Sequence, residues 1–187
     1  MGTCKYGDWT RGEEEALLNI LGGLEVARAI LRGAIKVVMQ VVKFIVDTFT
    51  VMVDETLSVE DAVKEGNFDW SNDNINSTNF PKPANGQKSE KEIAIFHFAK
   101  TMSSEAVIAE MNKAEYRPAT IWELTGLAKK EPDLQRKFPV VALGSVCELR
   151  GDRRVAGLYG DAGGRGLGLY CFGVDWSDRC RFAAVRK

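Results

Sequence analysis

The sequence predicts an α+β protein with one main module and a smaller amino-terminal part. Helix-capping residues followed by apolar residues at helical spacing alternate along the chain with apolar runs that are typical of strands. The chain has 187 residues, of which 45% are hydrophobic and 27% charged, so it can bury one substantial core and has the composition of a globular protein. We divide it into residues 1–35 and a main module of residues 36–187.

Residues 1–35 are predicted to form a pair of short helices. Thr10 and Glu13 have the spacing of a capping box, and the apolar residues of 16–21 recur after it at helical spacing. A second apolar stripe follows over residues 24–31. Acidic residues in both helices would repel DNA phosphates, so we interpret the pair as packing elements rather than as a DNA-binding helix-turn-helix.

The next segments predict strands and one helix. Residues 37–53 are rich in Val, Ile, Phe and Thr, which indicates one or two strands. Residues 57–64 fit a short helix capped by Ser58. Residues 67–87 contain many Asn, Ser and Pro residues and are predicted to be a long surface connection. The alternating apolar residues of 92–98 then predict a buried strand.

Two capped helices follow. Ser103 or Ser104 can cap a helix that ends at Met111. Thr120 begins the second helix, over residues 121–129, because Glu123 stands where a capping box requires it. The residues predicted to face inward are Val107, Ile108 and Met111 in the first helix and Leu124, Leu127 and Ala128 in the second.

The carboxyl-terminal part is predicted to combine an extended segment, a helical turn and two strands. Pro118 disfavours helix in the residue before it, so residues 116–120 should be extended. A short helical turn should start at Asp133. The strongly apolar residues 138–146 predict a buried strand, and residues 180–186 predict the final strand.

The segment from Leu149 to Arg186 lacks residue types that are common in the rest of the chain. Glu, Lys, Gln, Met and Trp account for 40 of the 187 residues, yet Trp176 is their single occurrence in this segment. These five residues are the ones that an Asn codon of the form A-A-pyrimidine cannot encode when its adenines are replaced by any base. The composition therefore predicts a segment diversified at adenines, which we assign to residues 149–180. A glycine-rich loop of accidental composition is the alternative.

The residues that flank this segment resemble a known family. Tyr-Arg-Pro-Ala-Thr-Ile-Trp-Glu-Leu at 116–124 resembles the strand-to-helix junction of the C-type lectin fold, in the branch shared with formylglycine-generating enzymes. Arg-Phe-Ala-Ala-Val-Arg at 181–186 is similar to the terminal strand of that branch. Together with the segment between them, these motifs resemble the variable proteins of diversity-generating retroelements, and the archaeal and candidate-phylum examples most closely. The resemblance covers residues 110–187.

This resemblance implies a C-type lectin-like fold with a mixed or antiparallel sheet and two flanking helices, preceded by the helical and β amino-terminal part. The amino- and carboxyl-terminal strands of the module would pair. It also implies a ligand-binding protein rather than an enzyme, with the varied residues on an exposed face. The ligand is expected to be a protein, held mainly by Tyr and Arg side chains.

The pattern within the segment separates a scaffold from a changeable surface. Trp176 cannot arise from an altered A-A-pyrimidine codon, so it should be a fixed residue. The expected scaffold residues are Trp122, Val155, Leu158, Leu167, Leu169, Phe172, Trp176 and Phe182. The expected ligand-binding residues are Gly157, Tyr159, Gly168, Tyr170, Cys171, Val174, Ser177, Asp178, Arg179 and Cys180.

Two other functions are compatible with such a fold. A formylglycine-generating enzyme depends on a close pair of cysteines in a formed active site, whereas Cys171 and Cys180 lie nine residues apart in the unusual segment. A calcium-dependent sugar-binding lectin is suggested by Glu131-Pro132-Asp133 and Trp176-Ser177-Asp178. Calcium takes six to eight oxygen ligands, however, and these triplets do not supply them.

The composition argues against several other partners. The four cysteines have no C-x-x-C spacing and His97 is the single histidine, so neither a metal site nor a cofactor is predicted, and His97 is assigned to the core or a sheet edge. The net charge of -1 argues against nucleic-acid binding. Charges interrupt the apolar stretch 34–53, which argues against membrane insertion.

The beginning of the chain lacks the basic and then apolar pattern of a signal peptide. A cytoplasmic or virion-associated location is therefore expected. The sequence assigns neither an oligomeric state nor the identity of the ligand.

Overall fold

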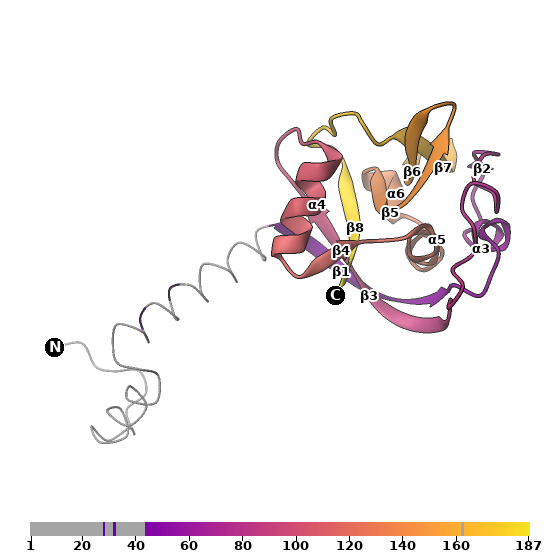
Figure 1. Cartoon of the computed structure of the whole chain (residues 1–187), viewed down its shortest axis with the longest axis horizontal. Helices are drawn as coiled ribbons and strands as arrows, with labels where there is room; N and C mark the ends of the chain where they lie inside the picture. The colour runs from indigo at the N-terminus through magenta and orange to yellow at the C-terminus, as the bar shows by residue number, and fades with distance from the viewer. Residues whose placement is uncertain (1–27, 29–31, 33–43, 162) are drawn as a thin grey trace, which may run out of the picture. The chain divides into compact units, whose positions relative to one another are not determined.

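The computed structural model describes Arg28, Arg32, residues 44–161 and residues 163–187 (Figure 1). The chain divides into two compact units, Met1–Val41 and Val42–Lys187.

Most of the first unit lies outside the described residues. Arg28 and Arg32 are helical, and the remainder of the helical pair predicted for residues 1–35 lies outside the described part of the chain. The same holds for the first half of the strand region predicted at 37–53, up to residue 43.

An eight-stranded mixed sheet is the framework of the second unit. Its strands are β1 (Ile45–Asp54), β2 (Trp70–Ser71), β3 (Lys88–His97), β4 (Tyr116–Pro118), β5 (Val140–Leu149), β6 (Asp152–Asp161), β7 (Gly164–Cys171) and β8 (Arg181–Arg186). Neighbours follow the order β1-β3-β8-β5-β6-β7-β2, with β4 beside β8. The β5–β8 and β2–β7 pairs are parallel and the other pairs are antiparallel. The α+β class is thereby confirmed.

Helices cover both faces of this sheet. The helices of the second unit are α3 (Val59–Glu65), α4 (Ser104–Lys113), α5 (Ile121–Lys130) and α6 (Leu134–Lys137). Figure 1 shows α5 enclosed by the curved sheet and α4 on the opposite side of β8. We call the side of the sheet toward α5 the inner face and the side toward α4 the outer face.

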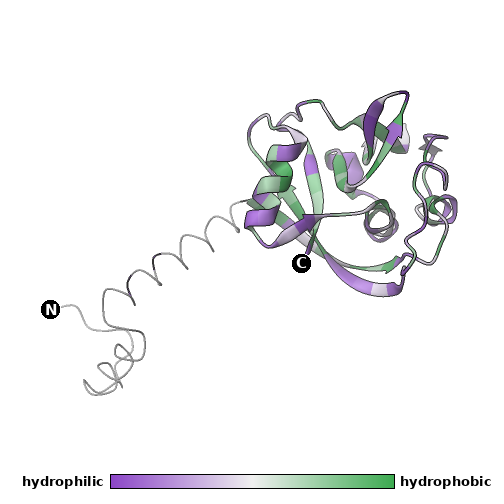
Figure 2. Ribbon diagram, in the orientation of Figure 1, coloured by the Kyte–Doolittle hydropathy of each residue, from purple (hydrophilic) through white to green (hydrophobic). Residues whose placement is uncertain are grey.

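The inner face carries the larger hydrophobic cluster. Its buried side chains include Ile93, Ile95, Leu124, Leu127, Leu158, Leu167 and Ala183. Burial of each large side chain of this kind contributes about 1.5–3 kcal/mol. In Figure 2 the central strand β8 is mostly hydrophobic, whereas the beginning of β3 is hydrophilic, because residues 88–92 are Lys, Ser, Glu, Lys and Glu. The core therefore lies under the middle of the sheet.

An aromatic layer fills the space between α4 and the outer face. The ring centroids of Phe96 and Tyr116 lie 5.3 Å apart, and those of Trp176 and Phe182 lie 5.9 Å apart. Val107 and Met111 of α4 are fully buried against this layer, as the helical pattern predicts, whereas Ile108 is only partly buried. The prediction that Ile108 faces inward is thus corrected, because the buried residues of α4 are Ser104, Val107 and Met111, and Ile108 lies about 100° from Val107 around the helix.

The predicted caps are confirmed. The Ser58 side chain accepts a hydrogen bond from the Asp61 amide at the start of α3, and Ser103 caps α4 in the same way. At α5 the capping box is complete, because Thr120 accepts from the Glu123 amide and Glu123 accepts from the Thr120 amide. Local residue chemistry is sufficient to place these three helix starts.

The prediction for residues 67–87 is wrong in one respect. Ile75 and Phe80 are buried in the inner cluster, and Trp70 and Ser71 form β2, which pairs with β7. The connection is polar in composition, yet two apolar residues are enough to anchor it. It therefore lies against the unusual segment rather than apart from it.

Gly144 lies where β5 passes the strand-to-helix junction. Its amide donates to the Ala119 carbonyl at 2.9 Å, and a β-carbon at Gly144 would lie 2.6 Å from the carbonyl oxygens of both Pro118 and Ala119. Gly144→Ala should therefore displace backbone and lower the free energy of unfolding by about 1–3 kcal/mol in urea denaturation. Gly173→Ala is the matched control, because its β-carbon would find no atom closer than 4.0 Å. Equal stabilities of the two variants would contradict this packing.

Candidate functional site

The unusual segment 149–180 forms the β6–β7 hairpin and the loop that follows it. Successive side chains of a strand point to opposite faces, so one set of residues lies on the inner face and the other on the outer face. Ala156, Leu158 and Leu167 belong to the inner cluster. The cross-strand pairs that share the outer face are Val155 with Tyr170, Gly157 with Gly168, and Tyr159 with Gly166.

Three glycines form a floor beneath the two tyrosines of this face. A β-carbon at Gly157 would lie 2.7 Å from the Tyr170 ring, and one at Gly168 would lie 3.2 Å from the Tyr159 ring. A β-carbon at Gly166 would overlap the Tyr159 ring. The absence of side chains therefore lets both rings lie directly over the backbone of the hairpin.

Gly157 and Gly168 were predicted to contact a ligand, and this prediction needs correction. Both residues are buried, because the rings of Tyr159 and Tyr170 cover them. Tyr159 keeps 38% of its surface exposed, and Tyr170 is half-buried. Burial also raises the pKa of the Tyr170 hydroxyl, so this group stays protonated and can donate a hydrogen bond.

Trp70 extends the aromatic surface beyond Tyr159. It pairs with Gly166 across the β2–β7 ladder, its ring centroid lies 6.2 Å from that of Tyr159, and it is 52% exposed. The sequence argument missed this residue because it lies far from the unusual segment along the chain. A tryptophan within a largely polar connection is the sequence signal that could have found it.

Trp176 closes the opposite end of the same surface and is buried. Its centroid lies 6.0 Å from that of Tyr170, and its indole N–H donates to the Ser104 hydroxyl at 2.8 Å. Ser104 in turn donates to the Phe172 carbonyl at 2.6 Å. The Trp176 backbone also exchanges both hydrogen bonds with Met102. This fully paired indole ties the loop to α4, which fits the scaffold role predicted for it.

The loop after β7 exposes its side chains while its backbone is held. Val174, Ser177, Asp178 and Arg179 are all exposed. The Arg181 guanidinium donates to the carbonyls of residues 178, 179 and 180 at 3.0–3.2 Å. The His97 ring lies 2.9 Å from the Asp178 carbonyl, so this loop contacts the end of β3, an interior strand of the sheet. The four exposed side chains are thus available at a fixed position.

The two cysteines of the segment are placed differently from each other. Cys171 pairs with Arg154 on the inner side of the hairpin, so it does not belong to the outer face, and its role as a ligand contact stays a prediction. Cys180 is half-buried, and burial raises the pKa of its thiol, which lowers its reactivity as a nucleophile. Both thiols are free.

The predicted scaffold residues lie inside the protein. Trp122, Val155, Leu158, Leu167, Phe172, Trp176 and Phe182 are buried, whereas Leu169 is partly buried against the inner cluster. Two polar residues of the scaffold were missed. Arg165 is 8% exposed and donates to the carbonyls of Asn67 and Ala128, and Gln135 donates to those of Tyr159 and Gly166. Together they join the inner side of the hairpin to α5, to α6 and to the connection after α3.

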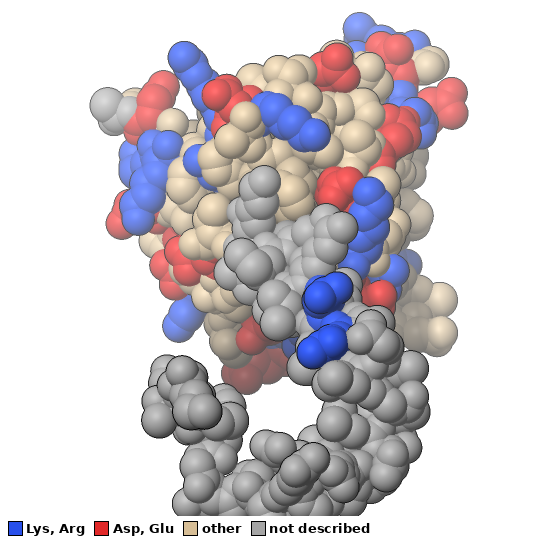
Figure 3. Space-filling view, turned by 90° about the vertical axis from the view of Figure 1, so that its left-hand side faces the viewer, with Lys and Arg blue, Asp and Glu red and all other residues tan. Residues whose placement is uncertain are grey.

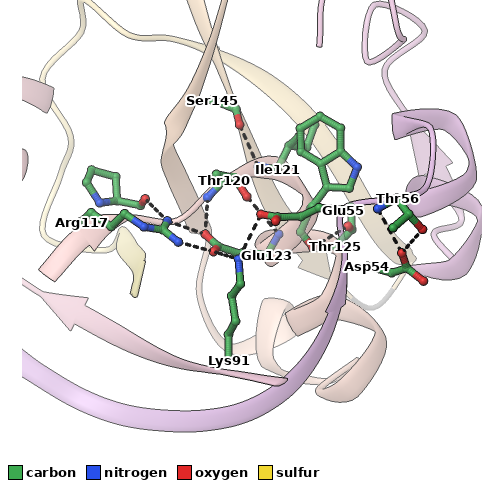
Figure 4. A network of polar contacts seen from close by, with 12 residues as sticks. Asp54, Glu55, Thr56, Lys91, Arg117, Thr120, Ile121, Glu123, Thr125 and Ser145 are labelled. Atoms are coloured by element: carbon green, nitrogen blue, oxygen red, sulfur yellow. Dashed lines mark hydrogen bonds and ion pairs between the residues drawn. The ribbon is translucent and has the colours of Figure 1, made fainter. Parts of the chain in front are cut away.

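A buried charged cluster surrounds Glu123 at the start of α5, and none of its members belongs to the β6–β7 hairpin (Figure 4). Glu123 is fully buried and accepts from Arg117 at 2.6 and 2.9 Å, from Lys91 at 3.1 Å and from the Thr120 amide at 2.7 Å. Burial alone would raise the pKa of Glu123. The hydrogen bonds and positive charges of its partners outweigh this effect, so the pKa lies below the ordinary value of 4.5. A fully paired carboxylate of this kind holds the start of α5 in place.

Among the described residues no group of three or more His, Cys, Asp or Glu side chains is arranged to hold a metal ion. Asp133 contacts Arg136 at 3.5 Å rather than a second acid. Within the described part of the chain, no helix has the length and apolarity that a membrane span requires. On the face seen in Figure 3, positive and negative side chains are interspersed over the described surface.

The candidate site is therefore the outer face of the β6–β7 hairpin with the exposed residues of the following loop. Trp70, Tyr159, Tyr170, Val174, Ser177, Asp178 and Arg179 make up this surface, which we call the aromatic face. No family model, curated protein or solved structure matches the chain.

Proposed function

We propose that this chain is a non-enzymatic ligand-binding protein whose aromatic face is diversified by a retroelement through adenine mutagenesis. The observation that carries the proposal is the residue content of exposed positions in the unusual segment. Every exposed charged residue from position 149 to 186 is Arg or Asp, whereas exposed charged positions between 44 and 148 are mostly Lys and Glu. Burial does not explain this difference, because Arg, Asp, Lys and Glu can each occupy an exposed position with little change in stability.

The set of residues that an altered Asn codon can encode explains the same difference. An A-A-pyrimidine codon altered at its adenines can encode Arg or Asp but cannot encode Lys or Glu. Exposed Lys and Glu residues such as Lys130 and Glu115 occur in the part of the chain before the segment, so a general preference of the chain for Arg and Asp is not the cause. The restriction to one segment supports local diversification.

The fold supports a C-type lectin-like assignment in its general plan. The expected pairing of the amino- and carboxyl-terminal strands is not found among the described residues, because β1 pairs with β3, and it is β3 that pairs antiparallel with β8 over Ile93–His97 and Arg181–Val185. The strand-to-helix junction that carries the sequence motif is β4 followed by α5. On this basis we propose that the second unit is a C-type lectin-like module, with the diversified segment presented on its surface.

The aromatic face has the chemistry of a protein-binding surface. Tyr and Trp offer large contact areas and few rotatable bonds, so they lose little conformational entropy on binding. Tyr159 and Trp70 are both exposed, and Arg179 adds a cation at the edge of the loop. A protein ligand that inserts between the tyrosines and the loop would use all of these groups.

The proposal predicts that the aromatic face tolerates random substitution. We expect most variants to remain folded when Tyr159, Val174, Ser177, Asp178 and Arg179 are replaced by residues that an altered A-A-pyrimidine codon can encode. Substitutions of exposed residues usually change stability by about 0.5 kcal/mol or less. A matched library at Ala156, Leu158, Arg165, Leu167 and Trp176 should lose most of its folded members, since these residues are buried. The fraction of displayed variants that resist protease measures the folded fraction of each library. Equal surviving fractions would contradict the division.

Two further measurements test diversification and binding separately. A reverse transcriptase gene and a near-identical template repeat that differs at adenines should lie beside the coding sequence, and their absence would refute diversification. Selection of the first library against an unrelated protein should yield binders that lose affinity when their selected residues are replaced by Gly. Failure to obtain any binder from a well-folded library would refute the binding role.

A further inference from the structure

The inner side of the β6–β7 hairpin has an open pocket of about 230 Å³ that is separate from the aromatic face. Arg154 and Leu169 of this pocket are followed along their strands by Val155 and Tyr170, which point to the outer face. The residues that line the pocket are Asn72, Asn74, Leu149, Arg150, Arg154 and Leu169. No carboxylate is among these lining residues.

The polar groups of the pocket are hydrogen-bond donors with spare capacity. Arg154 uses Nη2 to contact Asp152 at 2.9 Å, its Nη1 has no acceptor among the described residues, and its Nε is buried without an acceptor there. Arg150 is exposed, and its guanidinium has no acceptor in the described part of the chain. Asn72 accepts two hydrogen bonds from Asn74 through Oδ1, so its Nδ2 group remains available to donate.

The elements around the pocket hold these donors in place. The Asn72 amide donates to the Leu167 carbonyl at 3.0 Å, which joins the connection to β7. Arg150 has a left-handed backbone with φ of 55°, in the turn between β5 and β6. Leu149 and Leu169 provide apolar walls, and partial exclusion of water by such walls strengthens charge-assisted hydrogen bonds.

We propose that this pocket binds a small oxyanion, a phosphate or a carboxylate group. Two guanidinium groups and a side-chain amide can donate together to such an anion, and guanidinium geometry matches both groups. Asp152 does not line the pocket; it accepts from Nη2 of Arg154, and the bound anion would accept from the remaining guanidinium donors of the same residue. The volume lies below the 300–1,000 Å³ typical of drug-sized ligands, so the ligand is a small anion rather than a polymer.

Side-chain nitrogen spectra of the full chain test the proposal. Phosphate and acetate are titrated in separate samples, with chloride at matched ionic strength as the reference. We expect a saturable shift of the Arg154 Nε–H signal and of the Asn72 side-chain amide with phosphate, with acetate or with both, and the better ligand identifies the anion class. Non-saturable shifts equal to those in chloride would overturn the proposal.

Substitutions locate the binding. Arg154→Gln and Arg150→Gln should each weaken anion binding at least tenfold. Arg150 is an exposed turn residue, so Arg150→Gln still tests the site if Arg154→Gln impairs folding. Arg153→Gln is the matched control, because it removes the same charge from the adjacent residue, whose guanidinium contacts Glu105 and the Phe172 ring instead. The affinity of Arg153→Gln for the anion should stay within about twofold of that of the unchanged chain. Unchanged affinity in Arg150→Gln, or an equal loss in Arg153→Gln, would refute the assignment.

Discussion

Replacement of Glu123 by Ala is expected to lower the free energy of unfolding by about 3–5 kcal/mol, the cost of removing one partner from a buried ion pair. Glu123 is fully buried, and its loss would leave Arg117 and Lys91 without the carboxylate that they share. The amide of Thr120 would also lose its acceptor, so the start of α5 should fray. Urea denaturation followed by far-ultraviolet circular dichroism measures the change.

A surface ion pair provides the control for this substitution. Glu105 contacts Arg153 at 3.1 Å, and both side chains are more than half exposed. Glu105→Ala should therefore change stability only slightly, because exposed ion pairs contribute little. If Glu105→Ala and Glu123→Ala were equally destabilising, the buried network could not be the main support of α5.

The Glu123 network also predicts a dependence of stability on pH. The folded-state pKa of Glu123 lies below 4.5, so its contribution is fully present above that value and is lost as the pH falls through the folded pKa. Glu123→Gln keeps the size of the side chain and removes its titration. The stability difference between the unchanged chain and Glu123→Gln should therefore shrink in acid below pH 4.5. A constant difference down to acid pH would contradict this expectation.

Replacement of Trp176 by Ala is expected to cost about 3–5 kcal/mol, as for other buried aromatic residues. The indole is 4% exposed and contacts the rings of Tyr170 and Phe182. It also donates to Ser104, whose hydroxyl would lose that donor in the variant. Thermal or urea unfolding should show the loss together with release of the loop, seen as faster proteolysis between residues 173 and 180.

Two variants separate packing from hydrogen bonding at this position. Trp176→Phe retains most of the aromatic contact and removes the N–H donor, so it should cost less than Trp176→Ala. Tyr159→Ala removes a partly exposed aromatic residue of the same hairpin and should cost clearly less than Trp176→Ala, because Tyr159 is 38% exposed whereas Trp176 is 4% exposed. If Tyr159→Ala were as destabilising as Trp176→Ala, the division between scaffold and changeable surface would be wrong.

Sequence reasoning succeeded where local chemistry decides the structure. Ser58, Thr120 and either Ser103 or Ser104 were identified as helix caps, and Ser103 is the cap in the third case, because a short polar side chain before an amphipathic run has few other roles. The strands around Ile93 and Val140 were found because continuous apolar runs require burial. These assignments depend on residues close together in the chain.

Sequence reasoning was less successful where distant segments meet. The pairing of β2 with β7 brings Trp70 beside Tyr159, and nothing near either residue in the chain signals this contact. Gly157 and Gly168 were assigned to the ligand surface because they stand between the expected scaffold residues, but the rings of Tyr159 and Tyr170 cover them. Arg165 is a residue type that is usually exposed, yet it is buried and donates to the carbonyl groups of Asn67 and Ala128 from two other segments.

The sequence by itself determined the α+β class, the helix starts and the location of the compositionally restricted segment, because each of these depends on residue identity or spacing along the chain. The tertiary structure alone decided which residues of that segment remain accessible. Strand register and the packing of α4 bury Trp176 and Phe172 while leaving Tyr159 and Arg179 exposed. Exposure is a property of contacts between distant segments, and residue order does not specify those contacts directly.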